Sequence, residues 1–196
     1  MAGVHVLLIS GSLRAASTNS ALLRTADAVP VAGVSTELFD GMGALPHFNP
    51  DDDAEGLEPP APVAALRARL AAADAVLFCT PEYAGALPGS FKNLLEWAVG
   101  GEEIYRLPAA WVNAAPPGRG ENADDSLRKV LGYVGADVAE EAVRRVHVPH
   151  GAAGEDGIVA DPGVRAAIAA VLEALAAHVR ARRRDPDWVG RPGAPA

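Results

Sequence analysis

The chain has 196 residues, which is enough for one sizeable hydrophobic core but short for two ordinary domains. Hydrophobic residues make up 49% of it and charged residues 21%, which excludes a disordered chain and a coiled coil. Its formal net charge of -8 would repel a phosphate backbone or an anionic membrane, so we expect no nucleic acid and no membrane as a partner. The first apolar run, residues 4–9, is too short for a membrane span and lacks the basic segment of a signal peptide. We therefore expect a cytoplasmic protein.

Short apolar segments alternate along the chain with patterns of helical spacing. The apolar segments predict strands over residues 4–9, 34–39, 75–79, 109–114 and, more weakly, 143–148. The helical spacing predicts a helix from about Asn19 and others around residues 63–70, 91–98, 127–134 and 161–179. We expect residues 1–184 to form one domain and residues 185–196, rich in proline and glycine, to be a disordered tail.

This alternation predicts a doubly wound α/β fold, with a five-stranded parallel sheet between two layers of helices. The second strand contains Ser35 and Glu37 and the fifth contains Arg144, Arg145 and His147, which indicates that both are edge strands. The flavodoxin-like order 2-1-3-4-5 places those two strands at the edges. The Rossmann-type order 3-2-1-4-5 would expose an apolar strand, whereas the order 2-3-1-4-5 also satisfies the pattern and stays open.

The favoured order places a ligand site beyond the carboxyl ends of the first and third strands, where the connections reverse direction. The loops there are residues 10–19 and 80–90, with residues 114–122 close by. The first loop carries hydroxyls, an amide and Arg14 directly before a helix start, where free backbone N–H groups and the helix dipole favour a phosphate. It has neither the Walker ending nor the G-x-G-x-x-G pattern, so it suits a terminal monophosphate better than a bridging diphosphate.

Two motifs in these loops together resemble the NADPH-dependent FMN reductase family, which includes bacterial quinone, chromate and azo-dye reductases with a flavodoxin-like fold. The motif residues are Gly11, Ser12, Leu13, Arg14, Ser17 and Asn19, followed by Pro81, Glu82, Tyr83, Pro88, Gly89, Lys92 and Asn93. The resemblance extends in order and spacing over about residues 4–180. It implies an FMN-dependent NAD(P)H oxidoreductase, with NADPH or NADH as hydride donor and a small-molecule electron acceptor such as a quinone.

The resemblance also implies roles for individual residues. The residues it assigns to the FMN phosphate are Ser12, Arg14, Ser17, Asn19 and Ser20. The residues it places along the flavin ring and ribityl chain are Pro81, Glu82, Tyr83, Ala84 and Gly85. It assigns no catalytic side chain and no metal ligand, because the flavin itself carries the chemistry. It further implies a homodimer or homotetramer, with Phe91 and Trp97 offering apolar surface for the contact.

The chain departs from the family pattern in two loops. Ala84 stands where asparagine is usual, Ala86 where serine is frequent, and residues 115–122 contain two prolines where a glycine-rich run is common. Two alternatives stay open. One is a flavodoxin-type electron carrier that binds FMN but does not oxidise NAD(P)H. The other is a flavin-free domain that binds a phosphorylated ligand or a partner, which the alanines at 84 and 86 keep open. Cys79 is interpreted as a small buried hydrophobe, and His147 with His150 as an insufficient set of metal ligands.

Overall fold

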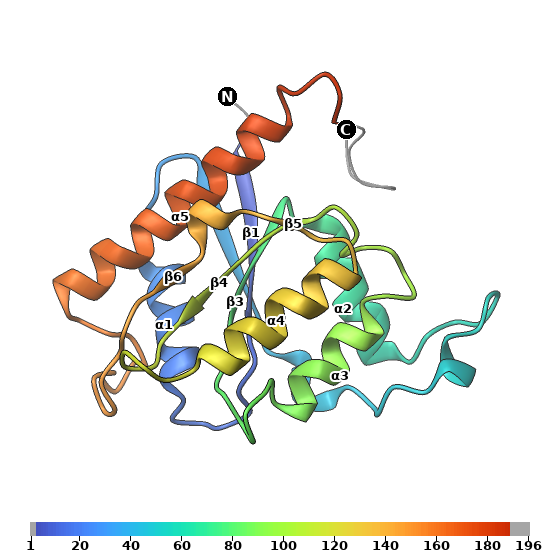
Figure 1. Cartoon of the computed structure of the whole chain (residues 1–196), viewed down its shortest axis with the longest axis horizontal. Helices are drawn as coiled ribbons and strands as arrows, with labels where there is room; N and C mark the ends of the chain where they lie inside the picture. Colours follow the sequence, from blue (N-terminus) through green and yellow to red (C-terminus); the bar gives the residue numbers. More distant parts are fainter. Residues whose placement is uncertain (1–2, 189–196) are drawn as a thin grey trace.

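A parallel sheet lies at the centre of the computed structural model, which describes residues 3–188 (Figure 1). Its strands are β1 (Val4–Ser10), β2 (Val34–Phe39), β3 (Ala75–Cys79), β4 (Pro108–Asn113), β5 (Asp137–Val138) and β6 (Arg144–Arg145). They run in the order β2-β1-β3-β4-β5, and β6 also pairs with β4. The flavodoxin-like order is confirmed, and the order with the third strand between the second and the first is excluded.

Helices cover both faces of the sheet (Figure 1). One face carries α1 (Thr18–Ala28) and α5 (Pro162–Arg182), and the other carries α2 (Ala61–Ala72), α3 (Gly89–Trp97) and α4 (Glu121–Tyr133). Short 3-10 helices lie in the connections: η1 (Gly41–Ala44), η2 (Pro50–Asp53) and η3 (Glu140–Ala142).

The central strands are apolar along their whole length because both of their faces are covered. Successive residues of a strand point to opposite faces, so Leu8 and Leu77 pack toward α1 and α5. Their neighbours Ile9 and Phe78 pack toward α2, α3 and α4. All four side chains are fully buried.

The fifth strand is not the continuous segment expected over residues 143–148. It is split into β5, which pairs with the start of β4, and β6, which pairs with its end. Between them η3 leaves the sheet, consistent with the low strand propensity of its alanine and glutamate residues. Val146 and Val148 then donate backbone hydrogen bonds to the carbonyls of Asn113 and Ala114 at 3.0 Å each. This edge pairing carries residues 147–150 to the carboxyl end of the sheet.

Phe91 and Trp97, expected to offer a subunit contact, are instead fully buried in the core of their own chain. The ring of Phe91 packs edge-on against Phe78, with 5.5 Å between centroids. The indole of Trp97 donates to the carbonyl of Pro46 at 2.8 Å. Their size reflects the packing of α3 against the sheet and the connection after β2, so they cannot form a surface contact.

Helix α5 is the one helix in residues 3–188 that is long and apolar enough to cross a membrane by length and composition. Its Ile168, Leu172 and Leu175 are fully buried with the sheet, so the apolar stripe serves the core. After α5 a turn brings the N–H of Trp188 to the carbonyl of Asp185 at 3.1 Å. The rest of the expected tail, residues 189–196, lies outside the described residues.

Candidate functional site

A cavity of about 760 Å³ opens at the carboxyl edge of the sheet, at the place predicted from the strand order. Its walls come from the start of α1, from residues 80–82, from residues 113–122 and from residues 147–150. Its volume falls within the range of small-molecule and cofactor sites. The start of α1 and the loops after β3 and β4 therefore meet around one space, and of the five residues assigned to the FMN phosphate Asn19 is the one that lines it.

The first loop is ordered by its own hydroxyl groups. Ser17 caps α1 and accepts a hydrogen bond from the N–H of Ser20 at 3.4 Å, while the Ser20 hydroxyl lies 2.9 Å from that of Ser10. The Ser12 hydroxyl accepts from the N–H of Arg14 at 3.3 Å. The first turn of a helix leaves backbone N–H groups without partners inside the helix, and the exposed Arg14 adds a guanidinium beside them. This combination suits a phosphate.

The first and second loops are in direct contact. Gly11 donates its N–H to the carbonyl of Cys79 at 2.8 Å, and a Cβ at Gly11 would overlap the side chain of Thr80. Only glycine allows this close approach of β1 to the residue after β3.

Asn19 reaches the cavity from the first turn of α1 and is held by Cys79. The thiol donates to Oδ1 of Asn19 at 3.2 Å, and only 8% of Asn19 is exposed. Burial raises the pKa of the Cys79 thiol, so the group keeps the proton that it donates. Because Oδ1 faces the thiol, the amide nitrogen of Asn19 is the atom free to donate to a ligand. Cys79 is buried as predicted, and it also orients a neighbouring side chain.

The second loop turns sharply after Glu82. Tyr83 and Ala86 exchange backbone hydrogen bonds at 3.0 and 3.1 Å, and the two residues between them have positive φ, 52° at Ala84 and 74° at Gly85. This is the pattern of a type I′ turn, whose first central position favours asparagine or glycine. Pro81 and Glu82 line the cavity, whereas Tyr83, Ala84 and Gly85 lie in the turn beyond its wall, with Tyr83 52% exposed.

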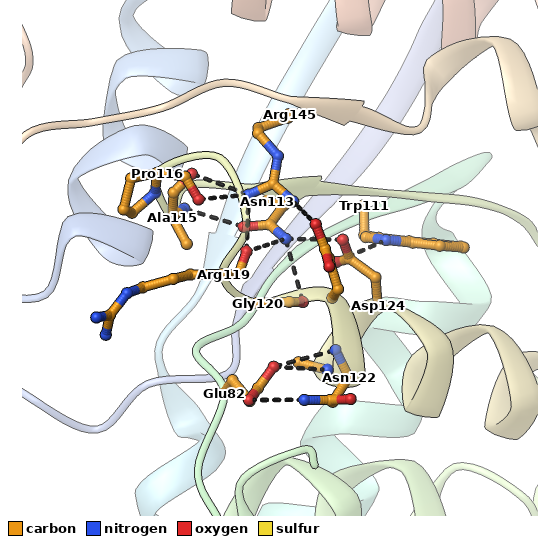
Figure 2. Close-up of polar contacts among 12 residues, drawn as sticks. Glu82, Trp111, Asn113, Ala115, Pro116, Arg119, Gly120, Asn122, Asp124 and Arg145 are labelled. Carbon is orange, nitrogen blue, oxygen red and sulfur yellow. Dashed lines mark hydrogen bonds and ion pairs between the residues drawn. The ribbon is translucent and has the colours of Figure 1, made fainter. Parts of the chain in front are cut away.

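Glu82 joins the second loop to the start of α4 (Figure 2). Its carboxylate accepts from the backbone N–H of Asn122 at 3.1 Å, from that of Ala123 at 3.4 Å and from the Asn122 side-chain amide at 3.1 Å. The helix needs this outside acceptor because its N-cap residue, Gly120, has no side chain. A negative charge at this end also favours the helix dipole.

The third loop is anchored by a polar network at the end of β4 (Figure 2). Asn113 donates to the carboxylate of Asp124 at 2.7 Å and accepts from the N–H of Ala115 at 2.9 Å, while Trp111 donates to the same carboxylate at 3.1 Å. Burial raises the pKa of Asp124, and the hydrogen bond from Asn113 and the charge of Arg145 oppose that rise. These hydrogen bonds thus fix the position of the first residues of the loop that borders the cavity.

The structure adds cavity residues that the sequence analysis does not assign to a ligand: Thr18, Thr80, Asn113, Arg119, Asn122, His147 and His150. Asn113 carries a sequence signal, since it is a polar residue at the end of an otherwise apolar strand. His150 lies 3.3 Å from Arg14, measured from Nε2 to Nη2, and so connects the fifth strand's extension to the first loop. The two residues are 136 positions apart, so no local sequence pattern indicates their contact.

The family model described as NADPH-dependent FMN reductase matches residues 4–148. The chain belongs to this family. It is 36% identical over 183 residues to an NAD(P)H-dependent FMN reductase of Pseudomonas aeruginosa, with 92% of this chain and 97% of the relative covered. It is 35% identical over 195 residues to a probable NADPH:quinone oxidoreductase of Oryza sativa subsp. japonica, with 93% and 95% covered. Among solved structures it is similar to FerB, a flavoenzyme NAD(P)H:(acceptor) oxidoreductase of Paracoccus denitrificans, at TM-score 0.77, 28% identity, and 91% and 98% coverage.

Family membership confirms the resemblance carried by the two loop motifs and makes the chain an FMN-dependent NAD(P)H oxidoreductase. The residues present fit the flavin nucleotide. A helix start that suits a phosphate, with Arg14 and the oriented Asn19 amide, lies beside a cavity large enough for a cofactor. The left-handed backbone at Ala84 also accounts for the asparagine that is usual there, because asparagine adopts positive φ more readily than alanine does.

Proposed function

We propose that the chain reduces a quinone or a similar small-molecule acceptor at the expense of NADPH or NADH, with FMN held in the cavity at the carboxyl edge. The observation that carries this proposal is the convergence of the start of α1 with the loops after β3 and β4 on one space. The names of the rice and Paracoccus relatives support the acceptor class. When bound, FMN supplies hydride uptake and electron delivery, so the site needs no side-chain acid or base.

The chain's own residues hold the cofactor. In this proposal the phosphate is bound by Ser12, Arg14, Ser17, Asn19 and Ser20, whose hydroxyl, amide and guanidinium donors surround the start of α1. Residues 81–82 form the wall that runs along the ring system, and Glu82 keeps that wall attached to α4. The turn of residues 83–85 forms the rim beyond this wall, where the exposed phenol ring of Tyr83 offers aromatic surface to a second ligand.

A homodimer or homotetramer and a cytoplasmic location stay predictions. Since Phe91 and Trp97 are buried, a subunit contact must use other residues. Light scattering of the purified protein at micromolar concentration tests the assembly, and a monomer there contradicts it.

The activity is tested by steady-state oxidation of NADPH in the presence of FMN and a soluble quinone. The proposal predicts turnover that depends on both FMN and the quinone. A protein that binds FMN yet shows almost no NADPH oxidation would be an electron carrier, and the proposal would be wrong.

A further inference from the structure

Arg119 lines the cavity from the loop between β4 and α4, and its charge is unused by the contacts described above. In Figure 2 its side chain extends away from Asn113 and Asp124. Within residues 3–188, no carboxylate lies at ion-pair distance from its guanidinium.

The backbone beneath Arg119 is held in place by a second arginine. Nη1 of Arg145 donates to the carbonyls of Ala115 and Pro116 at 3.0 Å each and to that of Arg119 at 2.8 Å (Figure 2). The proline pair at 116–117 further restricts the loop. The Arg119 side chain therefore starts from a fixed point in the cavity wall.

Most other charged groups of the wall already have partners. The Glu82 carboxylate is bound by the first turn of α4, and Glu121 lies 3.8 Å from Arg145, which also binds the loop carbonyls. Arg119 is the cation of the third loop that remains available to a ligand. The net charge of -8 makes the overall electrostatic field of the chain repel anions. An arginine without an ion-pair partner can still attract an anion locally.

We propose that Arg119 binds a phosphate group of the pyridine nucleotide; this rests on the proposed function. FMN carries one phosphate, for which the start of α1 and Arg14 already provide donors. The second ligand brings a diphosphate and, in NADPH, a further phosphate on the ribose. A guanidinium presents paired N–H donors that match phosphate oxygens, and Arg119 presents them from the third loop, whereas Arg14 belongs to the first.

The test compares Arg119→Ala and Arg119→Lys with the wild type. Arg144→Ala is the matched control, since Arg144 is exposed on β6, donates to the carbonyl of Val143 and lies outside the cavity wall. FMN affinity is measured by flavin fluorescence, the affinity of the FMN-loaded protein for NADP+ and NAD+ by calorimetry, and KM for NADPH and NADH by steady-state kinetics. We expect Arg119→Ala to weaken NADP+ binding and raise KM for NADPH about tenfold, with a smaller effect in Arg119→Lys. FMN affinity should stay unchanged in both variants, and Arg144→Ala should match the wild type.

The two nucleotides distinguish the two phosphate sources. A loss confined to NADP+ and NADPH assigns Arg119 to the ribose phosphate, and an equal loss with NAD+ and NADH assigns it to the diphosphate. Unchanged nucleotide affinity, or a loss of FMN affinity as large as that of the nucleotide, overturns the proposal. Failure of the proposed function would appear separately, as wild-type flavin that NADPH does not reduce.

Discussion

The carboxylate of Glu82 accepts hydrogen bonds from both the backbone N–H and the side-chain amide of Asn122, at 3.1 Å each. Glu82 comes from the loop after β3 and Asn122 from the first turn of α4, so the contact ties one wall of the cavity to another. It also supplies the acceptor that Gly120, at the N-cap of α4, cannot provide.

Glu82→Ala should lower the free energy of unfolding by about 1 kcal/mol, because α4 loses its N-terminal acceptor. FMN affinity should fall as well, since the second loop is released from α4. Urea denaturation and FMN titration measure the two effects, with Glu58→Ala as an exposed glutamate control. An unchanged FMN affinity in Glu82→Ala would show that the contact does not shape the cavity.

Cys79 is predicted to act on the cofactor through Asn19. Cys79→Ser keeps a donor to Oδ1 of Asn19, whereas Cys79→Val fills similar space without one. FMN affinity should therefore be close to that of the wild type in the serine variant and about threefold to tenfold lower in the valine variant. Equal FMN affinity in the two variants would contradict a positioning role for the thiol.

The turn of the second loop holds Ala84 at φ 52°. This left-handed conformation is unfavourable for an L-residue other than glycine, because its Cβ comes too close to the backbone. Ala84→Gly and Ala84→Asn should therefore raise the free energy of unfolding, by about 0.5–1 kcal/mol. Ala86→Gly is the control, because Ala86 is not among the residues with positive φ and should only lose stability. If Ala84→Gly is as destabilising as Ala86→Gly, the positive φ at Ala84 does not strain the turn.

Asp137 links β5 to the end of α5. Its burial alone would raise the pKa of the carboxyl, but hydrogen bonds from His178 at 2.8 Å and from Arg182 at 2.7 Å hold that pKa well below its ordinary value of 3.8. A carboxyl with a lowered folded pKa adds stability above its unfolded pKa, and this addition is lost as pH falls through the folded value.

Asp137→Asn should thus cost about 1–2 kcal/mol of unfolding free energy near neutral pH, a value reduced by the partial exposure of Arg182. The difference from the wild type should shrink as pH falls below about 4. Urea denaturation at several pH values measures it, with Asp187→Asn as control. A difference in unfolding free energy between the variant and the wild type that stays constant down to pH 2 would contradict a lowered pKa of Asp137.

The layout of the fold follows from the sequence because it depends on local composition. Ser35 and Glu37 mark an edge strand whatever the rest of the chain does, and the loop before α1 contains its own cap, Ser17. The split of the fifth strand and the burial of Trp97 depend on partners far away in sequence. The indole of Trp97, for example, binds the carbonyl of Pro46 across 51 positions.

The same limit applies to the site. A phosphate role for Arg14 is a prediction from sequence alone, because a guanidinium before a helix start suits a phosphate in any sequence. The function of Glu82 as a cap of α4 could not, because its partners lie 40 and 41 positions further on. The left-handed backbone at Ala84 was equally hidden, since alanine gives no signal for positive φ.

The visible absorption spectrum of the purified protein, recorded after FMN is added and the excess removed, shows whether the chain retains FMN and whether NADPH reduces it. We expect retained flavin bands that bleach when NADPH is added without oxygen, and weaker bands in Arg14→Ala, which lacks the guanidinium of the first loop. A wild-type protein that keeps no flavin at high micromolar FMN, or whose retained flavin is not reduced by NADPH, would contradict it.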